Sequence, residues 1–381
     1  SSEAFSRVSF LASTAGQSGA LHQHADNEYL WDQNIGDDFT LSALHQDSLF
    51  HRFASFLEAL RPDVVHIHHV AHLGVEILQV LKNVLPGVKI LYTLHEYMPI
   101  CHHYGQMRRP DGTLCERSDI DLCPRCFPLM TREDFWQRKT RLQHYFALVD
   151  RFVCPSEFLR QRYVDWGLAP ERLVTVENGL RPVPAVPPRP LKAGEGRCRF
   201  AFFGQFTPFK GLDFLLETLL RLPPEDLAQI TLEVHGGGLE SMPLAFQQRL
   251  TSLREKAEQT KAAIWRGPYR FDEVSDRMAN VDYVLVPSLW WENSPVVIQE
   301  AFAVGRPVLV SAIGGMAEKV RHGVNGLHVP VGDAQAWADT LLSIATDTAL
   351  YDRLCAGIVP PPTVEETTRR HLDLIRELTE N

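Results

Sequence analysis

Two glutamates, Glu292 and Glu300, combine residue type and spacing in a way that points to ligand chemistry. Residues 283–287 form a short apolar run that predicts a buried parallel strand, and a helix is expected after the loop that follows it. The N-terminus of such a helix attracts anions, because its free N–H groups and its dipole both point there. A carboxylate before the helix and another inside it could bind hydroxyl groups on either side of that anion. The pattern fits a nucleotide sugar, although two ordinary surface glutamates are the simpler explanation of the carboxylates alone.

The elements that would position these carboxylates can be predicted from the flanking residues. Ser294 is expected to cap the helix and Pro295 to occupy its first position, since Ser caps well and Pro needs no N–H donor there. The helix should end at Gly305, and residues 307–312 should form the next strand. The pair Gly314–Gly315 should open the turn after that strand.

A second candidate anion site precedes this segment. Residues 199–204 predict a strand that runs into the sequence GQFTPFKG, which includes Gly204, Gln205 and Lys210. Glycine lets the backbone approach a phosphate closely, and a lysine at the mouth of the next helix supplies a point charge. The alternative for Lys210 is a solvated surface base.

The string that runs from Glu292 through Glu300 to AFAVGRPVLVSAIGGMAEKVRHGVNGLHV resembles the C-terminal donor site of the retaining family 4 glycosyltransferases. The resemblance extends from about Pro62 to the C-terminus and is more specific in the second half. It implies an α/β chain of the GT-B architecture, in which two Rossmann-like domains with parallel sheets face each other. It also implies a retaining hexosyltransferase-type enzyme that moves a sugar from a nucleotide diphosphate sugar to an acceptor hydroxyl.

The resemblance implies a role for each matching residue. Charge builds up on the leaving diphosphate, and Lys210 with amide groups near residues 294–297 and 314–315 would stabilise it without a catalytic metal. Glu292 and His95 would contact the sugar, and Glu300 would contact the ribose. The predicted catalytic residues are His95, Lys210 and Glu292, and the predicted donor-binding residues are Gly204, Gln205, Lys210, Ser294, Pro295, Val296, Glu300, Gly314 and Gly315.

Two departures from the family pattern bear on activity. Gln205 stands where the family usually has an arginine, so one of two cations for the diphosphate is missing. The first half also lacks the strand and Gly-rich loop, close to GGxE, that usually open such a domain, and residues 7–13 look like its second strand. We therefore expect a truncated or reduced N-terminal domain. Because of these departures, the chain could instead be a catalytically weak module that binds a sugar nucleotide or takes part in assembly. A GT-B epimerase is a further alternative.

Length and composition limit the number of domains and the classes of function that fit these motifs. The 381 residues suit two α/β domains, and a formal net charge of −9 argues against general nucleic-acid binding. The Pro- and Gly-rich stretch after Asn178 indicates an interdomain linker. We expect an acceptor-side domain over residues 1–178, a donor domain over residues 179–364, and a C-terminal helix, 365–381, that joins the first domain.

Alternating apolar strands and helices in the first half predict a parallel, doubly wound sheet. His95 follows the strand at residues 89–94, and ligands of such sheets lie at the carboxyl ends of strands. A histidine that merely caps the strand end is the alternative. His66 and His68 alternate onto one face, which is compatible with a metal. No carboxylate or cysteine is in register with them, so we interpret them as core or cleft lining.

A cysteine-rich insertion occupies residues 101–126. Its last two cysteines form a CxxC pair, which suits a tetrahedral ion, and two further thiolates would complete a four-coordinate zinc site. The spacing of the first two is not that of a standard zinc knuckle, so free thiols and a disulfide pair stay open as alternatives. The predicted ligands of a structural zinc are Cys101, Cys115, Cys123 and Cys126.

Partners and location follow from weaker signals. No apolar run is long enough to span a membrane, no signal segment opens the chain, and seven unevenly placed cysteines suit a reducing compartment, so we expect a cytoplasmic protein. The helix predicted over residues 132–149 carries Arg138, Lys139 and Arg141 mostly away from its apolar face. It could lie on anionic lipid at the inner face of the membrane, although a helix packed on the sheet is the simpler interpretation. The resemblance implies a glycan or lipid-linked acceptor, in polysaccharide, lipopolysaccharide or glycolipid assembly.

Overall fold

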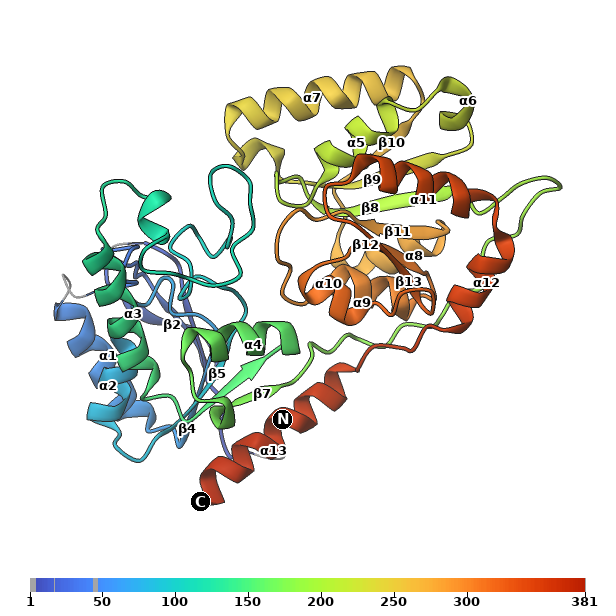
Figure 1. Cartoon of the computed structure of the whole chain (residues 1–381). Coiled ribbons are helices and arrows are strands. Elements are labelled where there is room, and N and C mark those ends of the chain that lie inside the picture. Colours follow the sequence, from blue (N-terminus) through green and yellow to red (C-terminus); the bar gives the residue numbers. More distant parts are fainter. Residues whose placement is uncertain (1–4, 17, 44–46, 381) are drawn as a thin grey trace. The chain divides into compact units, whose positions relative to one another are not determined.

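A computed structural model describes residues 5–16, 18–43 and 47–380 of the chain (Figure 1). The chain divides into two compact units. Unit 1 comprises residues 1–177 and 365–381, and unit 2 comprises residues 178–364. This division lies one residue from the boundary expected from the sequence.

Unit 2 is built on one sheet of six parallel strands. The strand order is β10-β9-β8-β11-β12-β13, so the chain starts in the middle, proceeds to one edge and returns to the other side. This is the strand order of a Rossmann fold, and its direction of winding reverses between β8 and β11. The strands are β8 (Arg199–Gln205), β9 (Thr231–Gly237), β10 (Ala263–Gly267), β11 (Tyr283–Val286), β12 (Val308–Ser311) and β13 (Gly326–Val329).

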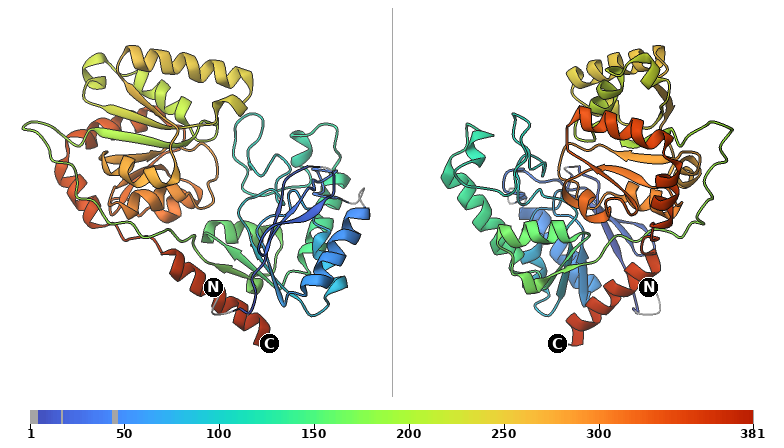
Figure 2. Two further views of the ribbon diagram at one scale, coloured as in Figure 1. Left: turned by 180° about the vertical axis from the view of Figure 1, so that it is seen from behind. Right: turned by 45° about the vertical axis from the view of Figure 1, so that its right-hand side comes forward.

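Helices cover both faces of this sheet (Figure 2). Successive residues of a strand point to opposite faces, so Phe200 and Phe202 pack in one core while Ala201 and Phe203 pack in the other. The first core is covered by α5 (Leu212–Leu220), α6 (Pro224–Leu227), α7 (Leu244–Gln259), α11 (Ala334–Thr346) and α12 (Thr348–Ala356). The second is covered by α8 (Val274–Ala279), α9 (Val296–Ala303) and α10 (Gly314–Lys319).

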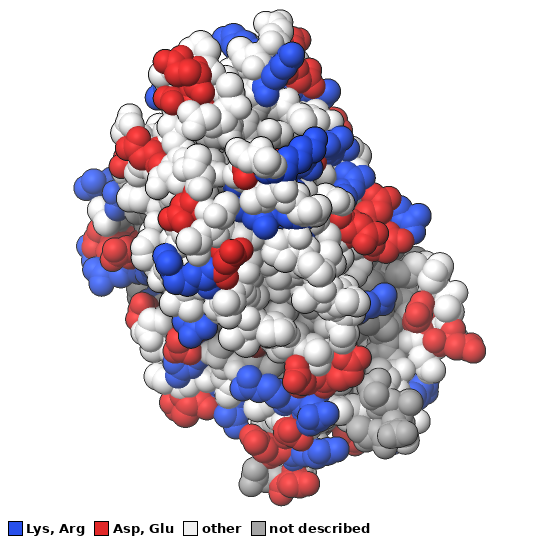
Figure 3. Space-filling view, turned by 90° about the vertical axis from the view of Figure 1, so that its right-hand side faces the viewer, with Lys and Arg blue, Asp and Glu red and all other residues white. Residues whose placement is uncertain are grey.

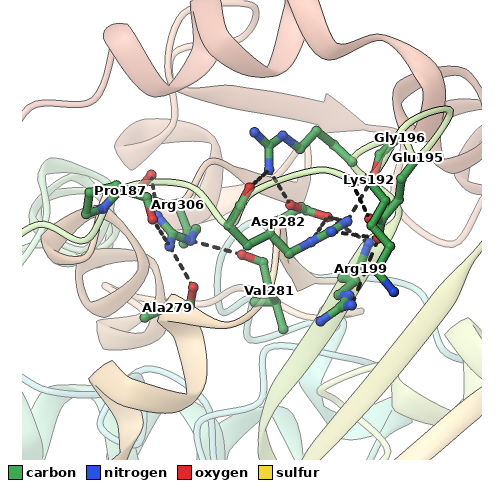
Figure 4. A network of polar contacts seen from close by, with 12 residues as sticks. Pro187, Lys192, Glu195, Gly196, Arg199, Ala279, Val281, Asp282 and Arg306 are labelled. Atoms are coloured by element: carbon green, nitrogen blue, oxygen red, sulfur yellow. Dashed lines mark hydrogen bonds and ion pairs between the residues drawn. The ribbon is translucent and has the colours of Figure 1, made fainter.

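The Pro- and Gly-rich stretch after Asn178 packs on unit 2 through hydrogen bonds and is not a free linker. Arg306 is fully buried, and its guanidinium group donates to the carbonyl oxygens of Val186 at 2.8 Å and Pro187 at 3.2 Å in that stretch. The same group donates to the oxygens of Ala279 at 2.6 Å and Val281 at 2.9 Å (Figure 4). The Arg306 side chain therefore links residues 186–187 of the stretch to the end of α8.

A second buried group fastens the other end of the stretch. The Asp282 carboxylate is fully buried and accepts from the Arg189 guanidinium at 2.8 Å, from Arg197 at 3.3 Å and from the backbone N–H of Arg199 at 3.0 Å (Figure 4). Arg189 also pairs with Glu195 at 2.6 Å. A buried carboxylate is tolerated when cations and N–H donors surround it, and here that requirement orders residues 189–199.

Unit 1 contains a four-stranded parallel sheet in the order β4-β5-β6-β7, which matches the alternation of strands and helices in the sequence. The C-terminal helix α13 (Val364–Glu380) packs Leu374, Ile375 and Leu378 against the core residues Leu91 and Val153 of this sheet. The other elements are β4 (Val64–Ile67), β5 (Lys89–Thr93), β6 (Arg151–Cys154), β7 (Leu173–Thr175), α1 (Asp47–Leu60), α2 (Ile77–Val84), α3 (Arg132–Phe146) and α4 (Glu157–Trp166).

The first strand of the chain does not join that sheet, which corrects the expectation for residues 7–13. Strand β1 (Phe10–Ser13) pairs in parallel with β3 (Glu28–Trp31), and β2 (Leu21–Ala25) pairs with β3 in antiparallel. The strands β2 and β3 lie in a stretch whose polar, His-rich sequence shows little periodicity. Trp31 anchors this small sheet, because it is fully buried and stacks on Phe53 of α1 with ring centroids 5.0 Å apart.

Two surface properties bear on partners. Among the described residues, the structure contains no helix that is both long enough and apolar enough to cross a bilayer. On the face shown in Figure 3, Lys and Arg side chains are interspersed with Asp and Glu side chains. The described residues of that face therefore offer no broad basic field for a nucleic-acid backbone.

Candidate functional site

The predicted donor residues of unit 2 lie where the winding of its sheet reverses. Strands β8 and β11 are neighbours, with Tyr283 opposite Phe200, and their loops emerge at the same edge. The two loops also bind each other, since the N–H of Leu289 donates to the carbonyl oxygen of Phe209 at 2.8 Å. Open α/β sheets bind ligands at this kind of reversal, outside the carboxyl ends of the strands.

Close contact between these loops explains one glycine. Gly211 has φ of +73°, and a Cβ there would lie 2.1 Å from the carbonyl oxygen of Pro287 at the end of β11. Only glycine fits this conformation and this approach without a shift of the backbone. The loop that carries Lys210 is thereby held against the loop that carries Glu292.

Lys210 and Glu292 form an ion pair, with Nζ 2.7 Å from Oε1. Two further donors bind the same oxygen, the Ser288 hydroxyl at 2.8 Å and the Trp290 indole N–H at 2.9 Å. Ser288 is fully buried and Trp290 packs on Phe209 with ring centroids 5.5 Å apart, so both donors are fixed. The carboxylate is thus held in one orientation by three donors on one oxygen.

The protonation state of Glu292 follows from these contacts. Burial alone would raise the pKa of this carboxyl, but the charge of Lys210 and the hydrogen bonds from Lys210, Trp290 and Ser288 outweigh it, so the pKa is lowered. The group is an anion at neutral pH. Within the described residues, Oε2 has no hydrogen-bond partner, so this oxygen remains open to a ligand hydroxyl.

Gly314 and Gly315 support the same loop from the other side. The N–H of Gly315 donates to the carbonyl oxygen of Glu292 at 2.8 Å, and a Cβ on Gly315 would lie 1.7 Å from the carbonyl oxygen of Asn293. The sequence predicts a turn at this pair. In the structure both glycines instead form the first residues of α10, because the backbone of residues 292–293 packs directly on them.

The start of α9 differs from its predicted form. Pro295 occupies the N-cap position, with Val296 as the first helical residue, and no side chain caps the helix. The hydroxyl of Ser294, expected to be the cap, has no partner in the described part of the chain although it is buried. The first turn of α9 therefore keeps N–H groups that no side chain satisfies.

Glu300 lies in α9 under different conditions from Glu292. It is half-buried, burial raises the pKa of its carboxyl, and within the described ranges it has no hydrogen bond or ion pair from its side chain. Tyr269 is near enough that burial, with the charge of Glu300, raises the pKa of its phenol to about 12. A desolvated carboxylate without a donor is a vacant acceptor site.

Gly204 and Gln205 end β8, beside Gly236 and Gly237 of β9. The side chain of Gln205 is exposed and has no partner among the described residues. Lys210 is therefore the basic side chain that the GQFTPFKG loop contributes, and its charge is already paired with Glu292. Sequence reasoning had identified Lys210 and Glu292 separately and did not foresee that they bind each other.

Unit 1 gathers histidines at the carboxyl ends of β4 and β5. The rings of His95 and His68 share a hydrogen bond of 2.9 Å between Nε2 and Nδ1. Burial and the neighbouring histidines lower the pKa of His95 to about 4, so both rings are neutral at pH 7. Nε2 of His66 is 2.7 Å from the Thr93 hydroxyl, and the ring of His371 of α13 lies tilted beside that of His66, with centroids 5.4 Å apart. Nothing in the local sequence of His371 indicates this place, because it reaches the sheet through the last helix.

The four cysteines of the insertion are not arranged as a metal site. Across residues 5–16, 18–43 and 47–380, no three His, Cys, Asp or Glu side chains are grouped so that they could hold an ion. The thiols of the four cysteines are nevertheless near one another, since, after burial, Cys101, Cys115 and Cys126 all help to raise the pKa of Cys123. Cys123 and Cys126 bracket a single 3-10 turn, while the N–H of Cys115 donates to Met107. Burial also raises the pKa of the Cys123 thiol to about 11. The structure therefore does not support a zinc shared by Cys101, Cys115, Cys123 and Cys126.

The bases of α3 also differ from their predicted positions. Arg138 is buried and donates to the carbonyl oxygens of Pro99 at 2.6 Å and Met98 at 2.7 Å. Arg141 binds the buried carboxylate of Glu76 at 2.5 Å. Two of the three bases proposed for a lipid surface are thus engaged inside unit 1.

Each unit matches a known sequence family over part of the chain. Residues 197–347 match the sequence model described as Glycosyl transferases group 1, and residues 39–182 match the one described as Glycosyltransferase Family 4.

Curated relatives match part of the chain. A D-inositol 3-phosphate glycosyltransferase of Nocardioides is 33% identical over 187 residues, which are 46% of this chain and 40% of that protein. A protein of the same name from Mycolicibacterium vanbaalenii is 32% identical over 223 residues, 55% of this chain and 49% of that protein. The chain thus spans about half the length, or less, of these curated relatives.

Solved structures show the same fold. Anabaena Alr3699/HepE in complex with UDP and glucose superimposes with a TM-score of 0.62 at 18% identity, over 91% of this chain and 85% of that chain. Sucrose-phosphate synthase from Thermosynechococcus elongatus gives a TM-score of 0.65 at 16% identity, over 97% and 88% of the two chains. The fold is therefore GT-B, and each unit matches a sequence model of glycosyltransferases.

Proposed function

We propose that this GT-B chain, with a glycosyltransferase sequence in each unit, is a retaining enzyme that transfers a hexose from a nucleotide diphosphate sugar to an acceptor hydroxyl. The observation that carries the proposal is the arrangement of Lys210, Glu292 and Glu300 at the reversal point of unit 2. One carboxylate is oriented by three donors, the other is unpaired, and a cation lies at the mouth of a helix.

The diphosphate of the donor would lie over the loop of Lys210 and the first turn of α9. As the bond to the sugar breaks, negative charge grows on the leaving phosphate, and donors already in place stabilise it without reorganisation. The free N–H groups near Ser294, Pro295 and Val296, and that of Gly314, would share this work with Lys210, while Gly315 holds the backbone of Glu292 in place.

The two glutamates would hold the hydroxyl-bearing ends of the donor. Oε2 of Glu292 is open while Oε1 is fully engaged, so the carboxylate can accept from a sugar hydroxyl without losing its own support. Glu300 would accept from the ribose hydroxyls, which would supply the donors that its half-buried carboxylate lacks. The structurally similar Anabaena protein was solved in complex with UDP and glucose, and that supports a nucleotide donor here.

Unit 1 would bind the acceptor. His95 is neutral, lies at the carboxyl end of β5 and is fixed by His68, so it can donate to or accept from a sugar hydroxyl. The D-inositol 3-phosphate in the name of the curated relatives supports a polar acceptor rich in hydroxyl groups, and a glycan or a lipid-linked group is proposed from the sequence resemblance alone. A cytoplasmic enzyme, in peripheral contact with the membrane when its acceptor is lipid-linked, fits this proposal.

The test is a panel of nucleotide sugars. Thermal shift identifies the donor that binds, sugar release to water measures turnover, and proton NMR of the released product with a simple alcohol as acceptor gives the anomeric configuration. Retention of configuration supports the proposal and inversion overturns the mechanism. Tight binding with no sugar release would favour a binding module, for which the uncharged Gln205 is the specific observation.

A further inference from the structure

Unit 1 contains a cavity that is separate from its histidine cluster. Its volume is about 410 Å³, and it lies between the insertion, the outer side of α3 and the end of α4. A cavity of this size accommodates a small polar molecule. Its charged and aromatic lining includes Arg117, Asp119, Trp136, Arg138, Lys139 and Asp165.

The first observation is a buried charge without a counter-ion. Arg138 is 3% exposed, and it donates to the carbonyl oxygens of Phe39, Met98 and Pro99. No carboxylate in the described ranges pairs with it. Burial lowers the pKa of this guanidinium to about 10, which leaves it charged at neutral pH. Three of its five N–H groups are used, so two remain for a ligand.

The second observation is that the other cations of the cavity are also unpaired. Within the part of the chain that the structure describes, neither Arg117 nor Lys139 has a hydrogen bond or an ion pair. The two carboxylates of the lining each have one oxygen engaged by a neutral donor. Oδ1 of Asp119 accepts from backbone N–H groups of the insertion, and Oδ1 of Asp165 accepts from the amide of Gln161 at 2.8 Å. Three cations and two carboxylates therefore line the cavity, which leaves one positive charge in excess.

The third observation is an exposed aromatic ring at the same place. Trp136 is 56% exposed although it lines the cavity. A tryptophan offers a flat apolar face with an N–H group at its edge, which suits a molecule that is apolar on one side and polar around its rim. A pyranose ring has this shape.

We propose that this cavity binds a saccharide that carries an anionic group, either a carboxylate or a phosphate. The anion lies against Lys139, Arg117 and the spare N–H groups of Arg138, and the ring rests on Trp136. The free oxygens of Asp119 and Asp165 accept from its hydroxyls. This site does not depend on the transfer reaction, because all of its residues belong to unit 1 and none is in the donor site.

The test is calorimetry of the full chain with four probes: glucuronic acid, glucose 6-phosphate, glucose and inorganic phosphate. We expect the two anionic sugars to bind and to bind more tightly than glucose or phosphate alone. Lys139→Ala and Trp136→Ala should each weaken this binding about tenfold, which corresponds to about 1.4 kcal/mol. Arg125→Ala, an exposed base in the same insertion but outside the lining, should leave it unchanged, as should Lys256→Ala in unit 2.

Each other result overturns the proposal. Absence of heat with both anionic sugars at millimolar concentration removes the site, and equal binding of inorganic phosphate reduces it to a general anion contact. Binding that UDP displaces belongs to the donor site instead. Thermal melting of each variant checks that it is folded. Because donor hydrolysis is measured separately, loss of this site and loss of the proposed transferase activity are distinguishable.

Discussion

The two carboxylates at either end of the 292–300 segment come from one short stretch of sequence and have opposite environments. Glu292 is almost fully buried, accepts from three donors, and has a lowered pKa. Glu300 is half-buried, has no side-chain partner in the described residues, and has a raised pKa. The first is stabilised by the protein itself. Glu300 loses hydration on burial, and no side chain in the described residues offsets that cost in free energy.

This contrast indicates that the two carboxylates have different roles in the site. A carboxylate fixed by lysine, tryptophan and serine keeps one geometry whether or not a ligand is present, which suits a group close to the reacting bond. A carboxylate left without donors gains most when a ligand brings hydroxyl groups to it. Function retained at a cost to stability is common at binding sites, and Glu300 fits that description.

The largest effect is expected for Lys210→Ala. Glu292 would then be buried without its cation, and breaking such a pair typically costs about 3 kcal/mol of folding stability. Because the pKa of Glu292 is lowered in the folded protein, this loss should be full at neutral pH and disappear as pH falls through that pKa. Affinity for a nucleotide diphosphate should also fall, and more than in Gln205→Ala. Denaturant unfolding at several pH values and calorimetry measure both, and unchanged diphosphate affinity would place the phosphates elsewhere.

Glu300→Gln should have effects of opposite sign on stability and binding. The amide removes a buried charge, so the protein should become more stable at pH 7–8. Since the pKa of Glu300 is raised, this gain should shrink as pH falls and vanish below about pH 4, where the unfolded carboxyl is also protonated. Nucleotide affinity should fall by about 10- to 100-fold, because a hydrogen bond to a charged group is worth about 1.5–3 kcal/mol. A variant that gains stability and keeps its affinity would remove Glu300 from the ligand site.

Local signals in the sequence located both carboxylates, their strand and their helix. These signals are the apolar run at residues 283–287 and the glycine-rich loop after Phe203. The elements that they indicate are short and depend on residues close in the chain, so a local pattern is enough to predict them. Arg138 shows that a local signal can also be overlooked. It lies three residues after Phe135 and four before Leu142, which places it on the buried face of α3 by helical period. Its charge led sequence reasoning to place it outside.

Contacts set by topology could not be predicted in this way. Lys210 and Glu292 are 82 residues apart, and they meet because β8 and β11 are neighbours in the strand order. The strands β2 and β3 lack a clear sequence signal for another reason. Residues 22–28 are all exposed, so no apolar alternation marks them, and the sheet depends on a contact between Trp31 and Phe53 of the next helix, which local pattern does not reveal.

Gln205→Arg tests whether a second cation that is not paired with Glu292 strengthens binding of the diphosphate. Lys210 is the basic residue of its loop, and Glu292 already draws on it, so the diphosphate meets less positive charge than two cations would supply. An arginine at this exposed position would add a planar fork with two donors for phosphate. We expect nucleoside diphosphate to bind about fivefold more tightly, by about 1 kcal/mol, with no change for the bare nucleoside. Equal gains for both ligands would mean that the new side chain contacts the nucleoside.

Trp290→Phe is expected to change the pH dependence and leave nucleotide affinity unchanged, because it removes one of the three donors to Glu292 and keeps the ring that packs on Phe209. Lys210 and Ser288 still bind the same oxygen, so the ion pair and the fold should persist. The pKa of Glu292 should rise, because a hydrogen bond to its anionic form is lost. The acid limb of the kcat/KM profile should therefore move to higher pH, while kcat/KM at neutral pH falls about two- to tenfold, as for one hydrogen bond of about 0.5–1.5 kcal/mol. Nucleotide affinity should be unchanged, since the ribose and the diphosphate do not depend on this indole. A parallel fall in nucleotide affinity, or a profile that does not move, would show that Trp290 acts through the fold of the loop and not through the carboxylate.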